Sequence, residues 1–306
     1  MLEKIILASI VRNNEFDPNI CLLVSSLRKF GGKLSEIPIW VFVPNSTNNI
    51  HEGLKIYLEL LNVKFFVYNI TSEESEFPLA DLVLAASEAE NLAIGKTNIL
   101  VWLDANTLIC NEPKEFLIEN SIKLGYRPVH HTLIGSLYNE PLDSFWSLIY
   151  NKCQVDVNKI FPMKTHVDGR ILRPYFNAGC LVVQPIAGLF KVWKEIFHQF
   201  YQDSDIEQFY HKKPVFKIFI HQVLLSCAIL TFLEQNDLKE LPFEYNFPLH
   251  LYAETNEEIQ PKSFEKLVTA RFEDINDPKW LEKIPLNTSL KYWLHNQLDI
   301  FKRMKK

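Results

Sequence analysis

Several signatures of well-known enzyme classes are missing from this sequence of 306 residues. Glycine occurs only nine times, and no G-x-G-x-x-G follows the first apolar segment, which excludes the dinucleotide-binding fingerprint. No G-x-S-x-G is present, so a hydrolase with that nucleophile turn has no support. The segment 93–97, "AIGKT", superficially resembles a phosphate-binding loop. However, Glu90 stands where that motif requires glycine, and the segment precedes a predicted strand instead of following one.

The sequence also lacks closely spaced cysteine pairs, a net positive charge and apolar runs long enough to span a membrane. The five cysteines are far apart, odd in number and form no C-x-x-C pair, so we expect reduced, buried thiols. The formal net charge of −5 gives no basic footprint for nucleic acid. The apolar stretch before Arg12 is too short to span a membrane and lacks a cleavage pattern. We therefore expect a cytoplasmic protein with no nucleic-acid partner.

Hydrophobic residues make up 47% of the chain and charged residues 23%, which is enough to bury a large core. The apolar segment at 4–11 is typical of a strand that is buried on both faces, and further strands are predicted at 38–44, 63–70 and 98–104. Segments with helical periodicity lie between them, at 18–30, 54–61 and 79–93. This alternation predicts an α/β fold with a mostly parallel sheet flanked by helices.

The regular alternation ends after residue 111. We expect a short helix at 142–150, a strand at 178–183, helices at 189–200 and 220–232, and a late strand at 267–272. The segments 125–168 and 203–217 are predicted to be irregular insertions. A closing amphipathic helix ends in the basic segment "KRMKK", which we interpret as a solvated helix end; peripheral membrane contact is the weaker alternative. Without repeats or linkers, the chain reads as a single domain over residues 1–306.

Polar residues at the ends of predicted strands are the candidate site. Asp104 ends an apolar strand, and Asn106 lies on the same side of an extended chain. Ligands of such sheets bind beyond the carboxyl ends of the strands, although a strand-end carboxylate that caps a turn is the simpler alternative. In the segment "FNAG", Asn177 and Gly179 precede another apolar strand, and the small residues allow a ligand to approach the backbone.

Two later segments add to this pattern. His221 and Gln222 are expected at the start of a buried helix, where free N–H groups favour anions, or where they simply cap the helix. Tyr245 and Asn246 lie in the proline-bounded segment "LPFEYNFP" and are interpreted as structural or acceptor-side residues. The adjacent histidines at 130 and 131 are more typical of surface or hydrogen-bonded residues than of metal ligands.

These four segments together resemble the nucleotide-sugar glycosyltransferases of the GT-A fold, especially glycosyltransferase family 8. The family has a D-x-D motif within a phrase like "LDADT", and residues 103–107 read "LDANT" here. Its "FNAG" phrase is matched at 176–179, its helical "DQ" appears as His221-Gln222, and its "LP…YNF" phrase is matched at 241–247. The resemblance covers residues 2–248 in order and approximate spacing.

The resemblance implies roles for the matched residues. Asp104 and Asn106 would bind Mn²⁺ or Mg²⁺, because hard oxygen ligands suit a cation that neutralises the leaving diphosphate. Gln222 and Asp104 would be the catalytic residues. The remaining donor-binding residues implied are Ser9, Val11, Arg12, Asn13, Asn177, Ala178, Gly179, His221 and Arg271.

Three positions depart from the family pattern. Asn106 replaces the second aspartate, and His221 replaces the helix aspartate. Arg271 stands near the place of a late metal-binding histidine, and only Lys279-Trp280 matches the end of that phrase. These changes predict a weakened or dispensable metal site, with Arg271 compensating the diphosphate charge.

The sequence thus predicts a glycosyltransferase that moves a sugar from a UDP- or GDP-sugar to an unidentified acceptor, with metal assistance. Residues 1–111 would form the nucleotide-binding half, and residues 112–306 would form the donor-sugar and acceptor half with the closing helix. The alternatives are a non-catalytic nucleotide-sugar-binding protein on the same fold, which the three altered positions motivate, and a nucleotidyltransferase. The latter lacks a glycine-rich phosphate loop.

Overall fold

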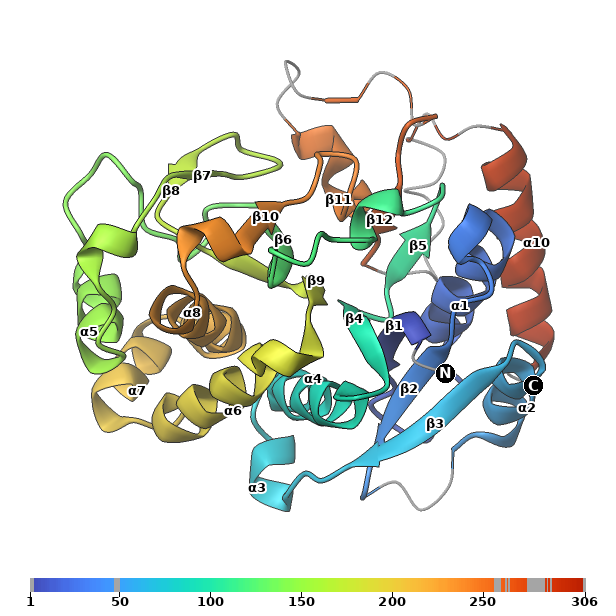
Figure 1. Cartoon of the computed structure of the whole chain (residues 1–306), viewed down its shortest axis with the longest axis horizontal. Coiled ribbons are helices and arrows are strands. Elements are labelled where there is room, and N and C mark those ends of the chain that lie inside the picture. Colours follow the sequence, from blue (N-terminus) through green and yellow to red (C-terminus); the bar gives the residue numbers. More distant parts are fainter. Residues whose placement is uncertain are drawn as a thin grey trace.

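A computed structural model of the chain shows helices packed on both faces of a central sheet (Figure 1). The structure describes residues 3–46, 50–255, 260, 261, 263, 265–273, 284, 286 and 288–304. The predicted residues Lys279 and Trp280 lie outside these ranges.

The central sheet has seven strands in the order β10-β6-β9-β4-β1-β2-β3. All of them run parallel except β9, which is antiparallel to both of its neighbours, β4 and β6. The predicted mostly parallel α/β sheet is therefore confirmed. The strands are β1 Glu3–Ile10, β2 Ile39–Pro44, β3 Val63–Tyr68, β4 Thr97–Leu103, β6 Leu124–Pro128, β9 Phe176–Val183 and β10 Leu238–Glu240.

Strand β1 explains why its sequence shows no polar alternation. Ile5 and Leu7 face one hydrophobic core, whereas Ile6 and Ala8 face the other, and all four are buried. A parallel strand covered on both sides has no solvent-facing row, so both rows must be apolar.

The helices divide between these two cores (Figure 1). One face of the sheet is covered by α1 Pro18–Phe30, α2 Glu52–Leu60 and α10 Thr288–Met304. The other face carries α4 Ala80–Ala93, α5 Ser144–Lys152, α6 Leu189–Phe200, α7 Ser204–Lys212 and α8 Pro214–Phe232, while α3 Ser72–Ser75 is a single turn that precedes α4. Because helices cover both faces of the sheet, a ligand site is expected beyond the carboxyl ends of the strands.

Helix α1 follows from its sequence. The Asp17 side chain accepts a hydrogen bond from the Asn19 backbone N–H at 2.9 Å, and Pro18 occupies the first turn. This is the expected start of a helix, because the first N–H groups lack partners within the helix. The helix ends at Phe30, next to Gly31.

A second sheet of three strands lies beside the carboxyl end of β4. It consists of β5 Thr107–Ile109, β12 Thr269–Arg271 and β11 Phe247–Pro248. Strand β12 is antiparallel to β5, with Arg271 opposite Thr107. This pairing brings Arg271 next to the segment that begins at Asp104. A two-stranded hairpin, β7 Met163–Lys164 and β8 Ile171–Leu172, lies elsewhere.

Two expectations from the sequence are corrected. The segments 125–168 and 203–217 are not irregular apart from the predicted helix at 142–150, which is α5, because they also contain most of β6 and all of α7. Helix α8 begins at Pro214 rather than at residue 220. Proline at the first helical position is preorganised for the helix, and the apolar run that guided the prediction starts only one to two turns later.

Helix α8 is also the helix, within the described residues, that is long and apolar enough to cross a membrane by length and composition. However, 61% of its apolar window is buried inside the protein. It packs against α6 and β9 in the core, which accounts for its composition. At the closing helix, Lys302 and Arg303 lie in the last turn of α10, and the final two lysines lie outside the described residues.

Glu90 is a buried carboxyl group between α4 and α6. Its Oε2 accepts a hydrogen bond from the Lys191 backbone N–H at 2.9 Å, and its exposed fraction is 1%. Burial raises the pKa of Glu90 to about 7, although backbone N–H groups at the start of α6 partly oppose this shift. The folded protein therefore holds this proton at pH values where the unfolded chain has released it.

We predict that Glu90→Gln stabilises the protein more at pH 8 than at pH 5. A carboxyl pKa that is raised on folding makes ionisation destabilising, so stability falls as the pH rises from the ordinary value of 4.5 through about 7. The neutral amide removes that loss, by roughly 1 to 3 kcal/mol at pH 8. Urea unfolding at both pH values measures the difference. Glu195→Gln on the exposed side of α6 is the matched control, and equal effects of Glu90→Gln at both pH values would contradict the prediction.

Candidate active site

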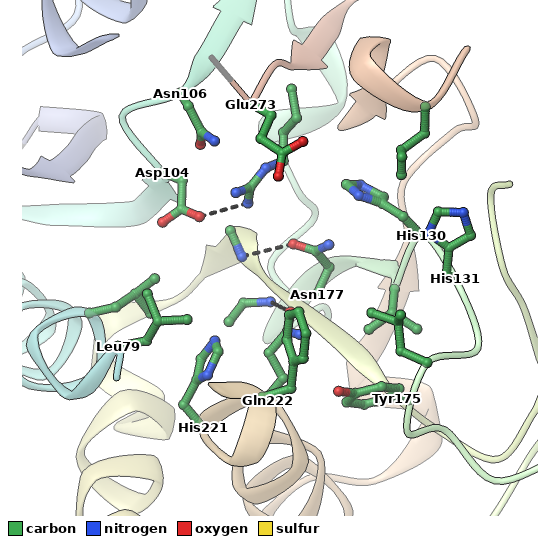
Figure 2. Close-up of a pocket in the computed structure, with 18 of the residues that line it drawn as sticks. Leu79, Asp104, Asn106, His130, His131, Tyr175, Asn177, His221, Gln222 and Glu273 are labelled. Carbon is green, nitrogen blue, oxygen red and sulfur yellow. Dashed lines mark hydrogen bonds and ion pairs between the residues drawn. The ribbon is translucent and has the colours of Figure 1, made fainter. Parts of the chain in front are cut away.

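A cavity of about 390 Å³ opens at the carboxyl ends of β1 and β4, beside the start of β9 and the first half of α8 (Figure 2). Its position is the one at which open α/β sheets bind ligands. Most of the residues predicted from the sequence line it: Arg12, Asp104, Asn106, Asn177, Ala178, Gly179, His221, Gln222 and Arg271.

Ser9, Val11 and Asn13 do not line the cavity. The Ser9 hydroxyl is buried and donates to the Leu103 backbone carbonyl at 2.7 Å, which joins β1 to the end of β4. Val11 is a core residue, and Asn13 is exposed and accepts a hydrogen bond from the Glu15 backbone N–H. Only Arg12 among the residues that follow β1 reaches the cavity.

An ion pair between Asp104 and Arg271 lies in the cavity wall. Arg271 Nη1 donates to Asp104 Oδ2 at 2.6 Å, and the two side chains are 18% and 11% exposed. Burial alone raises the pKa of Asp104, but the charges of Arg271 and Arg12 outweigh it and hold the pKa below its ordinary value. Asp104 is therefore an ionised carboxylate at neutral pH. Within the described residues, its other oxygen, Oδ1, is buried without a hydrogen-bond partner.

Gly179 allows this ion pair to form. A Cβ atom at that position would lie 1.8 Å from Arg271 Nη1 and 2.8 Å from Asp104 Oδ2. The Gly179 N–H donates to Asn177 Oδ1 at 2.9 Å, and the Gly179 carbonyl accepts from the Asp104 N–H at 3.0 Å. The glycine of the "FNAG" segment is thus required by a side-chain pair that comes from two other strands.

The Asn106 amide is held by the chain itself. Its Nδ2 donates to the Phe272 carbonyl at 2.8 Å, and the Phe272 N–H donates to the Asn106 carbonyl at 3.2 Å. These reciprocal bonds fasten the loop after β4 to the end of β12. They also fix the orientation of the amide that the sequence assigned to metal binding.

His221 and Gln222 extend from the third turn of α8 toward the cavity (Figure 2), not from its first residues as predicted. Gln222 Oε1 accepts from the Ala178 N–H at 3.0 Å, which fixes the glutamine against β9. His221 Nδ1 lies 3.0 Å from the Ile218 carbonyl, so Nδ1 carries the proton and Nε2 is an acceptor. Burial lowers the pKa of His221 to about 4, so the ring is neutral at pH 7.

Sequence reasoning missed several residues of the opposite wall. His130, His131, His250 and Glu273 line the cavity, and Figure 2 shows the first two and Glu273 beside it. His130 Nε2 lies 3.0 Å from the Asn246 carbonyl, and burial holds the pKa of His130 well below its ordinary value. The adjacent histidines were the available signal, although nothing local placed them at this edge.

Tyr245 and Asn246 support the site from outside it. The Tyr245 hydroxyl accepts from the Glu115 N–H at 3.0 Å, and the Asn246 N–H donates to the Thr269 hydroxyl at 2.7 Å. Neither residue lines the cavity, so their contacts agree with the structural interpretation.

The residues present do not fit a divalent cation. In the described part of the chain, no three His, Cys, Asp or Glu side chains converge to hold a metal ion. Asp104 already pairs with a guanidinium through Oδ2, and Asn106 contributes a neutral amide. Mg²⁺ and Mn²⁺ favour several oxygen ligands, and a guanidinium at the same carboxylate repels them.

We predict that Gly179→Ala destabilises the protein by roughly 1 to 3 kcal/mol, because the new methyl group displaces Arg271 and leaves a buried carboxylate unpaired. Urea unfolding monitored by tryptophan fluorescence measures the change. Gly53→Ala in helix α2 is the control: a Cβ atom there would lie 3.3 Å from its nearest neighbour, the His51 ring, and alanine favours the helix. Equal stability of Gly179→Ala and the wild type would show that the ion pair does not need the glycine.

Comparison with known proteins identifies the family. The model of the Rhodobacterales glycosyltransferase domain matches residues 7–232, which is more than half of the chain. No curated protein matches the sequence.

Solved structures with similar folds are glycosyltransferases. The galactosyltransferase LgtC, solved with donor and acceptor sugar analogs, is 12% identical over 97% of this chain and 95% of its own, with a TM-score of 0.49. Mouse xyloside xylosyltransferase 1 is 12% identical over 90% of this chain and 99% of its own, also with a TM-score of 0.49. The bifunctional glycosyltransferase WbbM is 12% identical over 96% of this chain and 52% of its own, with a TM-score of 0.50. The chain belongs to the Rhodobacterales glycosyltransferase domain family, and it is a glycosyltransferase with the GT-A-type fold that the sequence predicted.

Proposed function

We propose that this glycosyltransferase uses a nucleoside-diphosphate sugar as its donor and transfers the sugar to a hydroxyl group of an acceptor in the described cavity. The observation that carries the proposal is that two guanidinium groups, Arg12 and Arg271, line the cavity at the carboxyl ends of the strands together with the carboxylate of Asp104, which is paired with Arg271. The guanidinium groups suit a diphosphate, and the carboxylate suits sugar hydroxyls.

The nucleoside is proposed to occupy a second cavity of about 410 Å³ that adjoins the first. This cavity lies at the ends of β2 and β3, where Tyr68, Ile70 and Phe77 line it. Arg12 and Leu79 line both cavities, so a diphosphate between the nucleoside and the sugar would lie at Arg12. Arg12 is itself held by Asp81 at 2.5 Å.

The donor sugar is proposed to lie over the start of β9. Asn177 and Gly179 provide an amide and a close backbone approach there, and Gln222 lies beneath them on α8. In the transfer, the bond between the anomeric carbon and the diphosphate oxygen breaks, and both electrons leave with the diphosphate. The acceptor oxygen forms the new bond, and its proton passes to the oxygen of the departing diphosphate. Asp104, Asn177 and Gln222 are proposed to stabilise the positive charge that develops on the sugar.

The remaining wall is proposed to receive the acceptor. His130, His131 and His250 surround that side, together with the half-exposed side chain of Leu133. Burial lowers the pKa of His130 and of His250, and these two imidazoles and an aliphatic side chain suit an acceptor with hydroxyl groups.

Donor binding is tested by thermal shift against a panel of UDP- and GDP-sugars, because a ligand that binds the folded state raises Tm by mass action. We expect at least one member to raise Tm and to be transferred or slowly hydrolysed. No shift with any nucleotide sugar would overturn the proposal, whereas binding without any turnover would identify a non-catalytic binding protein.

We predict that Asp104→Asn lowers transfer on the order of 100- to 1,000-fold, because it removes the negative charge nearest to the proposed sugar position. The amide keeps the shape of the side chain, and circular dichroism checks the fold. Asp205→Asn, an exposed surface position that pairs with Lys152, is the control and keeps full activity. Unchanged transfer by Asp104→Asn would remove Asp104 from the mechanism.

A further inference from the structure

We propose that Arg271 itself performs the charge neutralisation for which this type of donor is expected to need a divalent cation, so that donor binding and transfer are independent of metal ions. This inference rests on the proposed function, since it concerns how the same cavity holds the diphosphate. It begins from the disagreement between the oxygen ligands implied by the sequence and the side chains that meet at Asp104.

Arg271 reaches the cavity from strand β12. Strand β12 places it opposite Thr107, and its Nη1 contacts Asp104 Oδ2 at 2.6 Å while the residue lines the cavity. The guanidinium has five N–H donors, and the contact with Asp104 uses one of its nitrogens. Its remaining N–H groups can bind phosphate oxygens directly, in the two-pronged manner that arginine favours.

Two of the side chains around Asp104 in the cavity wall are neutral. Asn106 is an amide, and His221 is a neutral imidazole that donates through Nδ1 to the Ile218 carbonyl. Asp104 is therefore balanced by one positive charge. Glu273 lies on the same cavity, but Asp104, Glu273 and His250 do not form a metal-binding group in the part of the chain that the structure describes.

The two carboxylate oxygens of Asp104 differ in their contacts. Oδ1 is buried and has no hydrogen-bond partner among the described residues, while Oδ2 is taken by Arg271. A buried carboxylate oxygen without a partner costs free energy, and a hydroxyl group of the donor sugar would satisfy it. One carboxylate thus has two functions that need no metal: Oδ2 positions the guanidinium, and Oδ1 accepts from the sugar.

Arg12 supplies a second guanidinium group to the cavity. Arg12 lines the same cavity and is held by Asp81 at 2.5 Å, as Arg271 is held by Asp104 at 2.6 Å. Two arginines, each oriented by its own carboxylate, therefore present their remaining N–H donors to a diphosphate from two sides of the cavity. Because both side chains are oriented before the donor arrives, little side-chain entropy is lost on binding.

Calorimetric titration of the full-length protein with UDP and GDP tests the metal dependence. The protein is first treated with EDTA, and titrations are run with EDTA, with Mg²⁺ and with Mn²⁺. We expect the nucleotide that binds to have the same Kd, within about twofold, under all three conditions, and Mn²⁺ alone to give no binding signal. Binding that requires Mg²⁺ or Mn²⁺ would overturn this inference and leave the proposed function standing. No binding of either nucleotide under any condition would instead overturn the proposed function.

Variants of Arg271 test its direct role. Arg271→Gln should weaken binding of the nucleoside diphosphate on the order of 10- to 100-fold, while Arg271→Lys, which keeps the charge but not the planar fork, should restore part of the loss. Binding of the corresponding free nucleoside should not change, because it carries no phosphate. Equal weakening of nucleoside and nucleoside diphosphate would indicate a structural role and contradict the inference. Arg170→Gln, at an exposed position outside the cavity, is the control.

Discussion

The ion pair between Asp104 and Arg271 joins segments that are distant along the chain. Asp104 follows the central strand β4, whereas Arg271 comes from the small sheet that the late part of the chain adds beside it. The pair passes over Gly179 on β9, so three strands meet at one contact of 2.6 Å. A buried carboxylate that lost its partner would be strongly destabilising, and therefore the end of β4, the start of β9 and strand β12 are held in one arrangement.

Much of the fold could be predicted because its signals are local. The apolar segments that became β1, β2 and β4 are buried on both faces, and such strands show in the sequence as continuous apolar runs, whereas β3 is an edge strand and is only partly buried. The start of α1 was equally clear, since Asp17 and Pro18 form a helix start by themselves. Strand β6 and helix α7 were harder, because they gain stability from the core around α8 rather than from strong local patterns.

The site could be located more easily than its internal contacts. The strand-end rule and the small residues of "FNAG" indicated the correct edge of the sheet. The partners of the site residues depend on pairing between β5 and β12, which no local pattern specifies. For that reason the sequence did not predict that the Asn106 amide nitrogen donates to the Phe272 carbonyl. The histidines of the far wall, such as His130, likewise come from loops whose paths are set by tertiary contacts.

Strand β9 has a feature that bears on how this chain can change. Phe176 and Ala178 belong to the same core as Leu181 and Val183, so the alternation of faces slips by one residue between Ala178 and Leu181. The pairing with β6 shifts register in the same region. An irregularity of this kind redirects side chains beside a site, here Asn177 and Gly179. Chain length is consequently constrained more tightly than composition in this segment, since removing one residue would turn the remaining core positions of the strand to the wrong face of the sheet. Within this family, variation at the site is expected to proceed by substitution, with insertions and deletions confined to the loops around it.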